Sequence, residues 1–176
     1  SILYSLLLKS YLLLDVMLLG FFYCWRVILG AEAIVIGNNI WFLSAVFLLF
    51  LSLGFGKRDI ELKKNIASGT KSKNISGRAY TVHDSNLISI LGVASSVMTT
   101  LVVLIYGLIS DQTIFKNDLS IILITLILFY WQSRFWILVN RGNIDDDPVS
   151  FAIKDKVSIY VLICFALIAI LEQLWH

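Results

Sequence analysis

The feature that most constrains this chain is a set of long runs without a charged residue. Residues 85–110 form one such run and residues 33–56 form another. About a quarter of the residues in an ordinary soluble domain are charged, because charge solvates its surface. Here 59% of the residues are hydrophobic and 15% are charged. The solvent for most of this chain must therefore be lipid.

The apolar runs have the length of membrane-spanning helices, which need about 20 residues each. Scanning for them predicts an all-α, polytopic transmembrane bundle. The predicted spans cover about residues 11–30, 40–55, 86–109, 119–139 and 157–174. Two long polar connections, residues 57–85 and 140–156, separate them on one side. The connections on the other side are short.

The positive charges of the loops fall almost entirely on one side of this layout. Lys116 stands alone on one side. The opposite side carries Lys9, Lys57, Arg58, Lys63, Lys64, Lys71, Lys73, Arg78, Arg141, Lys154 and Lys156. The positive-inside rule makes the crowded side cytoplasmic. We expect an integral protein of a bacterial inner membrane whose active face is cytoplasmic, with the lysines of the 57–85 loop facing anionic membrane lipids.

Several other classes of function are excluded by the composition. Cys24 and Cys164 lie inside apolar runs, and His83 and His176 have no ligand spacing around them, so a structural zinc site is not expected. The net charge of +2 is too small for a nucleic-acid partner. Because the chain opens without Met in an apolar stretch, we interpret it as the C-terminal part of a longer protein.

Charged residues within the predicted spans are informative, because each costs about 2.5 to 3.5 kcal/mol at the helix centre. Asp15 and Arg26 are eleven positions apart, which places them on one helix face about 16 Å apart along the axis. They are candidates for a common groove, with Asp15 orienting an acceptor and Arg26 binding phosphate. Arg134 is a third candidate for phosphate binding. The alternative is that these side chains snorkel to the membrane interfaces.

A charged cluster lies where the second span meets the cytoplasm. Lys57 and Arg58 follow two glycines, and Asp59 and Glu61 follow at once. Lysine and arginine neutralise phosphate oxygens and carboxylates hold Mg²⁺, so the cluster suits a diphosphate with magnesium. In a continuous helix the two carboxylates point about 200° apart and share a ligand only if the segment unwinds. A positive-inside anchor is the alternative for the two cations.

The second acidic cluster is the run of three aspartates at residues 145–147, which precedes Pro148. Such a run is a possible magnesium ligand set. It is equally a signal for a turn and a helix cap. Both interpretations are retained.

The charged and small residues together resemble a known family. Four stretches carry the resemblance, and they extend over almost the whole chain. They are Tyr4 to Lys9 with Leu14-Asp15-Val16, Arg26 to Gly30, Gly56-Lys57-Arg58 with Glu61-Leu62, and Gly77 to Tyr80 with Arg141-Gly142 and Asp146 to Ser158. The chain resembles the C-terminal half of the UbiA superfamily of intramembrane transferases. Within it, the resemblance favours the branch of decaprenyl-phosphate phosphoribosyltransferase and the haloacid dehalogenase-fused enzymes.

The resemblance implies about nine membrane helices around a cavity open to the cytoplasm, of which five are present here. Family members bind magnesium and the donor diphosphate with two acidic motifs, and the first lies in the half that this chain lacks. The second has the form DxxxD, and Lys57-Arg58-Asp59-Ile60-Glu61 stands in its place. On this basis Asp59 and Glu61 are the expected catalytic and metal-binding residues, and Asp15, Arg26, Lys57, Arg58 and Arg134 are the expected substrate-binding residues.

The expected function is transfer of a prenyl group from a prenyl diphosphate to an acceptor, with magnesium-assisted loss of diphosphate. The partner is then a lipid-linked prenyl phosphate or diphosphate. Phosphoribosyl transfer to polyprenyl phosphate is the alternative that the basic pair favours. A non-enzymatic membrane scaffold or permease subunit is an alternative from another class. As a fragment without the first acidic motif, the chain is expected to be inactive by itself.

Overall fold

The computed structural model describes residues 11–33, 39–67, 80–109, 117–144 and 147–175. In these ranges the chain is all-α, and no β-strand is found in them. The elements in chain order are α2 (Leu14–Ala33), α3 (Ile40–Ala67), the 3₁₀ helix η2 (Val82–Asp84), α4 (Ser85–Ile109), α5 (Asp118–Asn140), α6 (Pro148–Lys154) and α7 (Lys156–Trp175).

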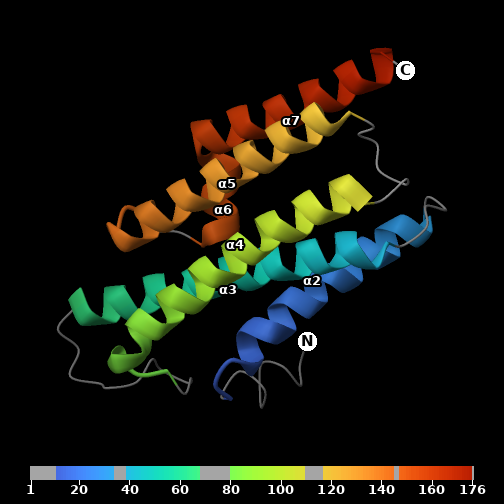
Figure 1. Ribbon diagram of the computed structural model, residues 1–176. Coiled ribbons are helices and arrows are strands. Elements are labelled where there is room, and N and C mark those ends of the chain that lie inside the picture. Colours follow the sequence, from blue (N-terminus) through green and yellow to red (C-terminus); the bar gives the residue numbers. More distant parts are fainter. Residues whose placement is uncertain (1–10, 34–38, 68–79, 110–116, 145–146, 176) are drawn as a thin grey trace.

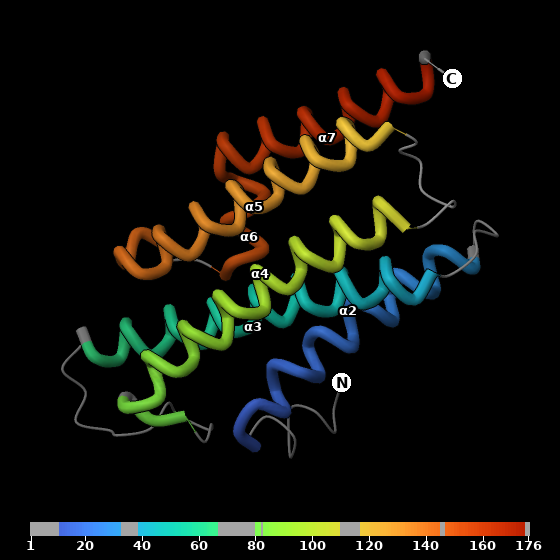
Figure 2. Tube along the Cα trace, viewed as in Figure 1, coloured from blue at the N-terminus to red at the C-terminus, as the bar shows by residue number. Residues whose placement is uncertain are grey.

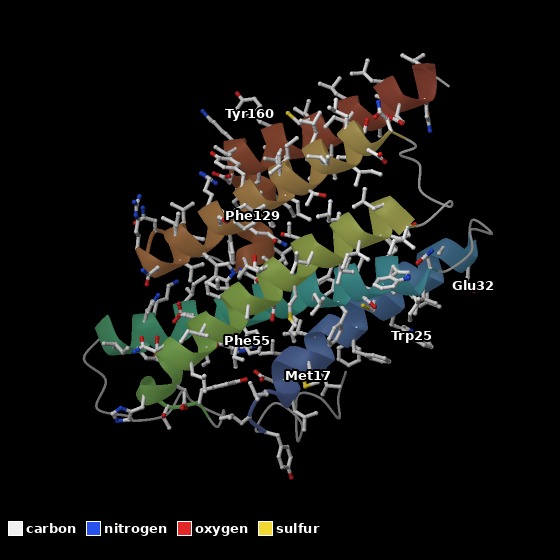
Figure 3. All side chains as sticks on the ribbon, viewed as in Figure 1. Met17, Trp25, Glu32, Phe55, Phe129 and Tyr160 are labelled. Atoms are coloured by element: carbon white, nitrogen blue, oxygen red, sulfur yellow. The ribbon has the colours of Figure 1, made fainter. Side chains whose placement is uncertain are left out.

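Five of the described helices are long and apolar enough to cross a membrane, namely α2, α3, α4, α5 and α7. Each coincides with one predicted span, so the expected fold class is confirmed. The apolar faces of these helices remain largely exposed. Trp25 on α2 and Tyr160 on α7 point away from the bundle (Figure 3), and their exposed fractions are 52% and 64%. Outward-facing side chains of this kind are what a lipid solvent requires.

The helices form an open row in which each long helix contacts the next. α3 packs against α2 and α4, α4 packs against α5, and α5 packs against α7 (Figure 1). The short helix α6 contacts both α3 and α7, so it links the second helix of the row to the last (Figure 2).

Close helix packing depends on glycine at positions where the neighbouring side chain leaves no room. A Cβ on Gly92 of α4 would lie 2.0 Å from Cζ2 of Trp136 on α5. The same tryptophan donates from its indole nitrogen to Ser52 Oγ on α3 (3.0 Å), and Ser52 donates to the Gly92 carbonyl (2.9 Å). Small residues and interhelical hydrogen bonds are the usual means of holding helices together in lipid. These three residues therefore fasten α3, α4 and α5.

The structure differs from the predicted spans most clearly at the end of α3. The predicted span ends at residue 55, whereas the helix continues to Ala67 and has 28 residues in all. The added segment is charged, but its charges pair along the helix. Arg58 contacts Glu61 three residues on, and Asp59 contacts Lys63 four residues on. Pairs at these spacings support a helix, so a segment expected to begin the 57–85 loop is helical.

Candidate functional site

Charged side chains gather at one end of the bundle. This end contains the starts of α2, α4, α6 and α7 and the ends of α3 and α5. The opposite end carries another buried carboxylate, Glu172 of α7, which accepts hydrogen bonds from the Ser120 hydroxyl (2.5 Å) and the Asn117 backbone (2.8 Å) at the start of α5. That contact ties α5 to α7. The charged end is the candidate functional site.

The centre of the site is a buried ion-pair cluster that joins α2 to α3. Arg58 Nε lies 2.8 Å from Asp15 Oδ2, and Arg58 Nη1 donates to Glu61 Oε2 at 2.6 Å. The side chains of Asp15 and Arg58 are 0% and 1% exposed. A buried arginine held by two carboxylates is neutralised by the protein itself. Arg58, expected to bind phosphate, is instead engaged with Asp15 and Glu61.

Tyr80 completes this cluster from the segment that precedes α4. Its buried phenol donates to Asp15 Oδ1 (2.7 Å) and accepts from the backbone N–H of Leu13 (3.0 Å). Leu13 has a φ of 66°, a backbone conformation that is strained for leucine. Burial, together with the Asp15 carboxylate, raises the pKa of Tyr80. Sequence reasoning assigned this tyrosine no role, because only folding brings it beside Asp15.

Asp59 belongs to a separate group of contacts. Its carboxylate lies 2.7 Å from Lys63 Nζ and accepts from the Ser85 hydroxyl at 2.9 Å, which ties α3 to the start of α4. Glu61 of the same continuous helix pairs with Arg58, which also contacts Asp15 of α2. Within the described ranges, no three metal-ligating side chains gather as a metal site. Asp59 and Glu61 are thus engaged with different partners, Asp59 with Lys63 and Ser85 and Glu61 with Arg58.

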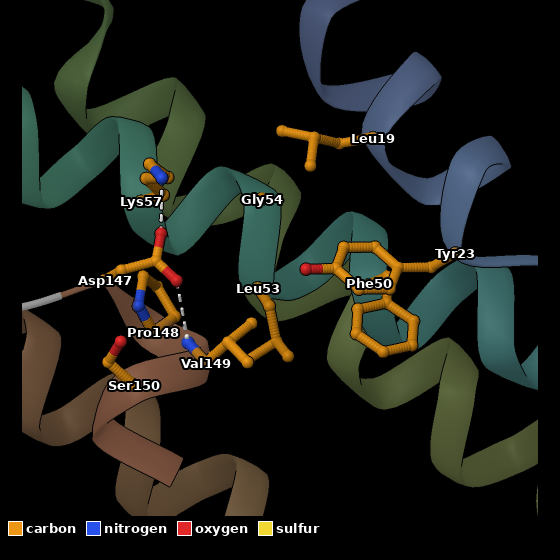
Figure 4. Close-up of a pocket in the computed structure, with 10 residues that line it drawn as sticks. All are labelled: Leu19, Tyr23, Phe50, Leu53, Gly54, Lys57, Asp147, Pro148, Val149 and Ser150. Atoms are coloured by element: carbon orange, nitrogen blue, oxygen red, sulfur yellow. Dashed lines mark hydrogen bonds and ion pairs between the residues drawn. The ribbon is translucent and has the colours of Figure 1, made fainter. Parts of the chain in front are cut away.

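A pocket of about 300 Å³ opens beside the cluster, between α2, α3 and α6 (Figure 4). Lys57 and Asp147 form an ion pair at its polar end, and both side chains are more than one third exposed. Asp147 is also the N-cap of α6, where it accepts from the Val149 backbone at 3.3 Å. The cap interpretation of the aspartate run is thus confirmed for Asp147. Residues 145 and 146 lie outside the described residues.

The wall of the pocket is apolar and partly aromatic. It is formed by Leu19 and Tyr23 of α2 and by Phe50 and Leu53 of α3. The rings of Tyr23 and Phe50 are stacked, with their centroids 3.8 Å apart. The guanidinium of Arg26 lies over the Tyr23 ring, 5.2 Å from the ring centroid. Arg26 and Asp15 are thus on one helix but in different surroundings, because Asp15 is buried among charges and Arg26 is exposed beside an aromatic ring.

Arg134 lies at the same end of the bundle, in a third set of contacts. Its guanidinium donates two hydrogen bonds to the Asp155 carboxylate, from Nη1 to Oδ2 (2.7 Å) and from Nη2 to Oδ1 (3.0 Å). Asp155 also accepts from the backbone and hydroxyl of Ser158, both at 2.8 Å. Partial burial works to raise the pKa of Asp155, but the hydrogen bonds from Arg134 and Ser158 outweigh it and lower the pKa. Arg134 does not line the pocket described above. Of the expected phosphate-binding residues, Lys57 is the one that does.

The fold and the site define a polytopic all-α membrane protein with a charged end and an adjoining amphipathic pocket. No family model matches the chain, and no solved structure matches it. The chain is 28% identical over 160 residues to the uncharacterized protein y4nM of Sinorhizobium fredii. That alignment covers 90% of this chain and 31% of y4nM. It is 24% identical over 170 residues to the nodulation protein NoeC of Azorhizobium caulinodans, covering 95% of this chain and 54% of NoeC. The chain thus spans about a third and about half of these relatives.

Proposed function

We propose that this chain is part of an intramembrane transferase that binds an isoprenoid phosphate or diphosphate in the pocket between α2, α3 and α6. The observation that carries the proposal is the pairing of an apolar wall with one accessible cation, Lys57, at the polar end. An isoprenoid phosphate has the matching division into an apolar chain and a charged head. Its chain is placed along Phe50 and Leu53, and its phosphate beside Lys57.

The reaction proposed is prenyl transfer from a prenyl diphosphate to an acceptor. Loss of diphosphate leaves an allylic cation on the donor, and the departing anion must be neutralised as it forms. Lys57 supplies positive charge to that anion. The apolar wall, which includes Phe50 and Leu53, excludes water that would capture the allylic cation. The buried cluster of Asp15, Arg58 and Glu61 holds α2 and α3 in the spacing that forms the pocket.

Phosphoribosyl transfer from phosphoribosyl diphosphate to polyprenyl phosphate is the second candidate. The observation that favours it is that Lys57 is the accessible cation in the described part of the pocket, since Arg58 is buried and neutralised. One lysine matches a monophosphate more closely than a diphosphate. In this version the pocket holds the acceptor lipid, and Lys57 orients its phosphate oxygen toward the oxocarbenium ion of the ribosyl donor.

The orientation proposed places the charged end in the cytoplasm of a bacterial inner membrane. The support is the loop charge: the described residues Arg141, Lys154 and Lys156 lie at this end, together with the lysines of α3. Among the described residues, no three His, Cys, Asp or Glu side chains gather as a metal site, and the expected magnesium remains a prediction from the family resemblance.

The test uses the full-length protein in detergent with added magnesium. One reaction contains labelled prenyl diphosphate and para-hydroxybenzoate, and the other contains labelled phosphoribosyl diphosphate and polyprenyl phosphate. Release of pyrophosphate in either reaction, lost with Lys57→Ala and retained with Lys154→Ala at an exposed position outside the pocket, supports the transferase and identifies its donor. No release in either reaction, with no binding of the lipid phosphates, supports the non-enzymatic scaffold instead.

A further inference from the structure

The ion pair between Lys57 and Asp147 has a consequence for any anion that enters the pocket. Lys57 extends from α3 and Asp147 from the start of α6, so the pair bridges two elements across the polar end (Figure 4). The side chains are 39% and 37% exposed, so both remain open to a ligand. In the described part of the pocket lining, Lys57 carries the positive charge and Asp147 the negative charge.

These two groups differ from the other ion pairs at this end of the bundle. Arg58 and its partner Asp15 are almost fully buried, and Arg134 donates two hydrogen bonds to the carboxylate of Asp155. A half-exposed lysine–carboxylate pair is weak, because water competes for both charges. Such a pair can be opened by an incoming anion at small cost.

We infer that Asp147 is a built-in competitor for the anion site on Lys57. The inference rests on the proposed function, and it concerns the same pocket. In the ligand-free protein the carboxylate occupies the position on Lys57 that a phosphate oxygen takes in the complex. Binding therefore requires that the phosphate displace Asp147 from Lys57. It also requires that the phosphate tolerate the negative charge nearby.

This arrangement sets the selectivity of the pocket. Binding of an anion without an apolar chain has two free-energy costs. The anion must displace the carboxylate from Lys57, and the same carboxylate then repels it. An isoprenoid phosphate offsets both costs by burying its chain against Phe50 and Leu53. Small anions of the aqueous phase, such as inorganic phosphate or pyrophosphate, gain nothing from the apolar wall. Asp147 thus lowers the affinity of the Lys57 site for small anions and makes the site selective for ligands that carry an apolar chain.

The test measures binding of inorganic pyrophosphate and of farnesyl monophosphate to the purified full-length protein in detergent, by calorimetry. Asp147→Asn removes the competing charge and keeps the side-chain oxygen that caps α6. We expect it to bind pyrophosphate about fivefold or more tightly than the unchanged protein, in line with loss of a weak ion pair and of one repulsion. Asp118→Asn, which removes an equal charge at the opposite end of the bundle, is the matched control and leaves binding unchanged.

Two outcomes separate this inference from the proposed function. If Lys57→Gln abolishes binding of farnesyl monophosphate while Asp147→Asn binds pyrophosphate no more tightly than the unchanged protein, the competitor role is overturned and the pocket stands. If Lys57→Gln leaves binding of both ligands intact, the anion site itself is overturned. A thermal unfolding curve for each variant shows that the fold is retained.

Discussion

The Asp15 carboxylate at the start of α2 lies 2.8 Å from Arg58 Nε in α3, and both side chains are closed to solvent. The two residues are separated by 42 intervening positions and by the connection from α2 to α3. Their contact fixes the relative position of two walls of the pocket. The pair is buried, so removing either charge leaves the other with less electrostatic compensation in a medium of low dielectric constant.

Replacing Arg58 by Met should destabilise the protein by about 3 to 5 kcal/mol, because it removes the guanidinium that compensates the fully buried carboxylate of Asp15. The double substitution with Asp15→Asn should recover part of that loss. Free energies of unfolding in detergent for the two single variants and the double variant complete the cycle. Strict additivity of the two single effects would mean that the pair is not energetically coupled.

Tyr80→Phe should cost about 1 to 3 kcal/mol, because the variant leaves the Leu13 N–H and one Asp15 oxygen without their partner. Tyr130→Phe is the matched control, since Tyr130 is 56% exposed on α5. A loss of similar size in both variants would contradict the role given to Tyr80.

The same tyrosine predicts a loss of stability at alkaline pH. Its pKa is higher in the folded protein than the ordinary value of 10.0. The unfolded chain therefore releases the proton first, so the contribution of Tyr80 is complete below about pH 10 and decreases as pH rises above that value. Unfolding curves from pH 8 to 11 should show a steeper decline for the unchanged protein than for Tyr80→Phe. Equal slopes would argue against this assignment.

The pair of Arg134 and Asp155 predicts a change at the acidic end of the pH range. The pKa of Asp155 is below its ordinary value of 3.8. The carboxylate thus contributes fully above about pH 4, and its contribution of about 1 kcal/mol is lost as pH falls through the lowered value. Melting temperatures at pH 6 and pH 3 should differ less for Asp155→Asn than for the unchanged protein, with Asp118→Asn as the control at an exposed acidic position.

Gly92→Ala should disrupt the packing of α3, α4 and α5, because the added methyl group would lie 2.0 Å from the Trp136 ring. We expect a loss of about 1 to 3 kcal/mol or more. Gly30→Ala is the control, since nothing lies within 4 Å of the corresponding position on α2. There alanine should be neutral or stabilise the helix by about 0.5 to 1 kcal/mol. Unfolding in a detergent titration separates the two variants.

Much of the fold follows from the sequence because the signals in it are local. Uncharged runs such as residues 85–110 predict helices without reference to any neighbour, and the structure confirms all five. The end of α3 was not predicted, since hydropathy treats Lys57 to Lys63 as loop. The ion pairs that keep this segment helical, such as Asp59 with Lys63, depend on side-chain direction rather than on composition.

The candidate site could be predicted only as a collection of residues. Asp15 was singled out as a charge within an apolar run and Arg58 as part of the charged cluster after two glycines, and both lie at the charged end of the bundle. Which partner each residue takes depends on how helices pack, so the sequence could not indicate that Arg58 is neutralised by Asp15 while Lys57 faces a pocket. Tyr80 and Asp147 gain their roles from contacts across 65 and 90 positions of the chain.

The length of α3 determines how a ligand encounters Lys57. A helix of 28 residues extends about 42 Å, whereas the hydrocarbon core of a bilayer is about 30 Å thick. Lys57 follows Ile40 by 17 residues, about 26 Å along the helix axis, so a helix that enters the hydrocarbon core at Ile40 brings Lys57 close to the opposite edge of the core, where its amine extends to the lipid headgroups. A ligand whose tail is dissolved in the leaflet reaches this depth by lateral diffusion and never leaves the membrane. Occupancy of the pocket then follows the mole fraction of that lipid in the leaflet, and dilution of the surrounding aqueous phase leaves it unchanged.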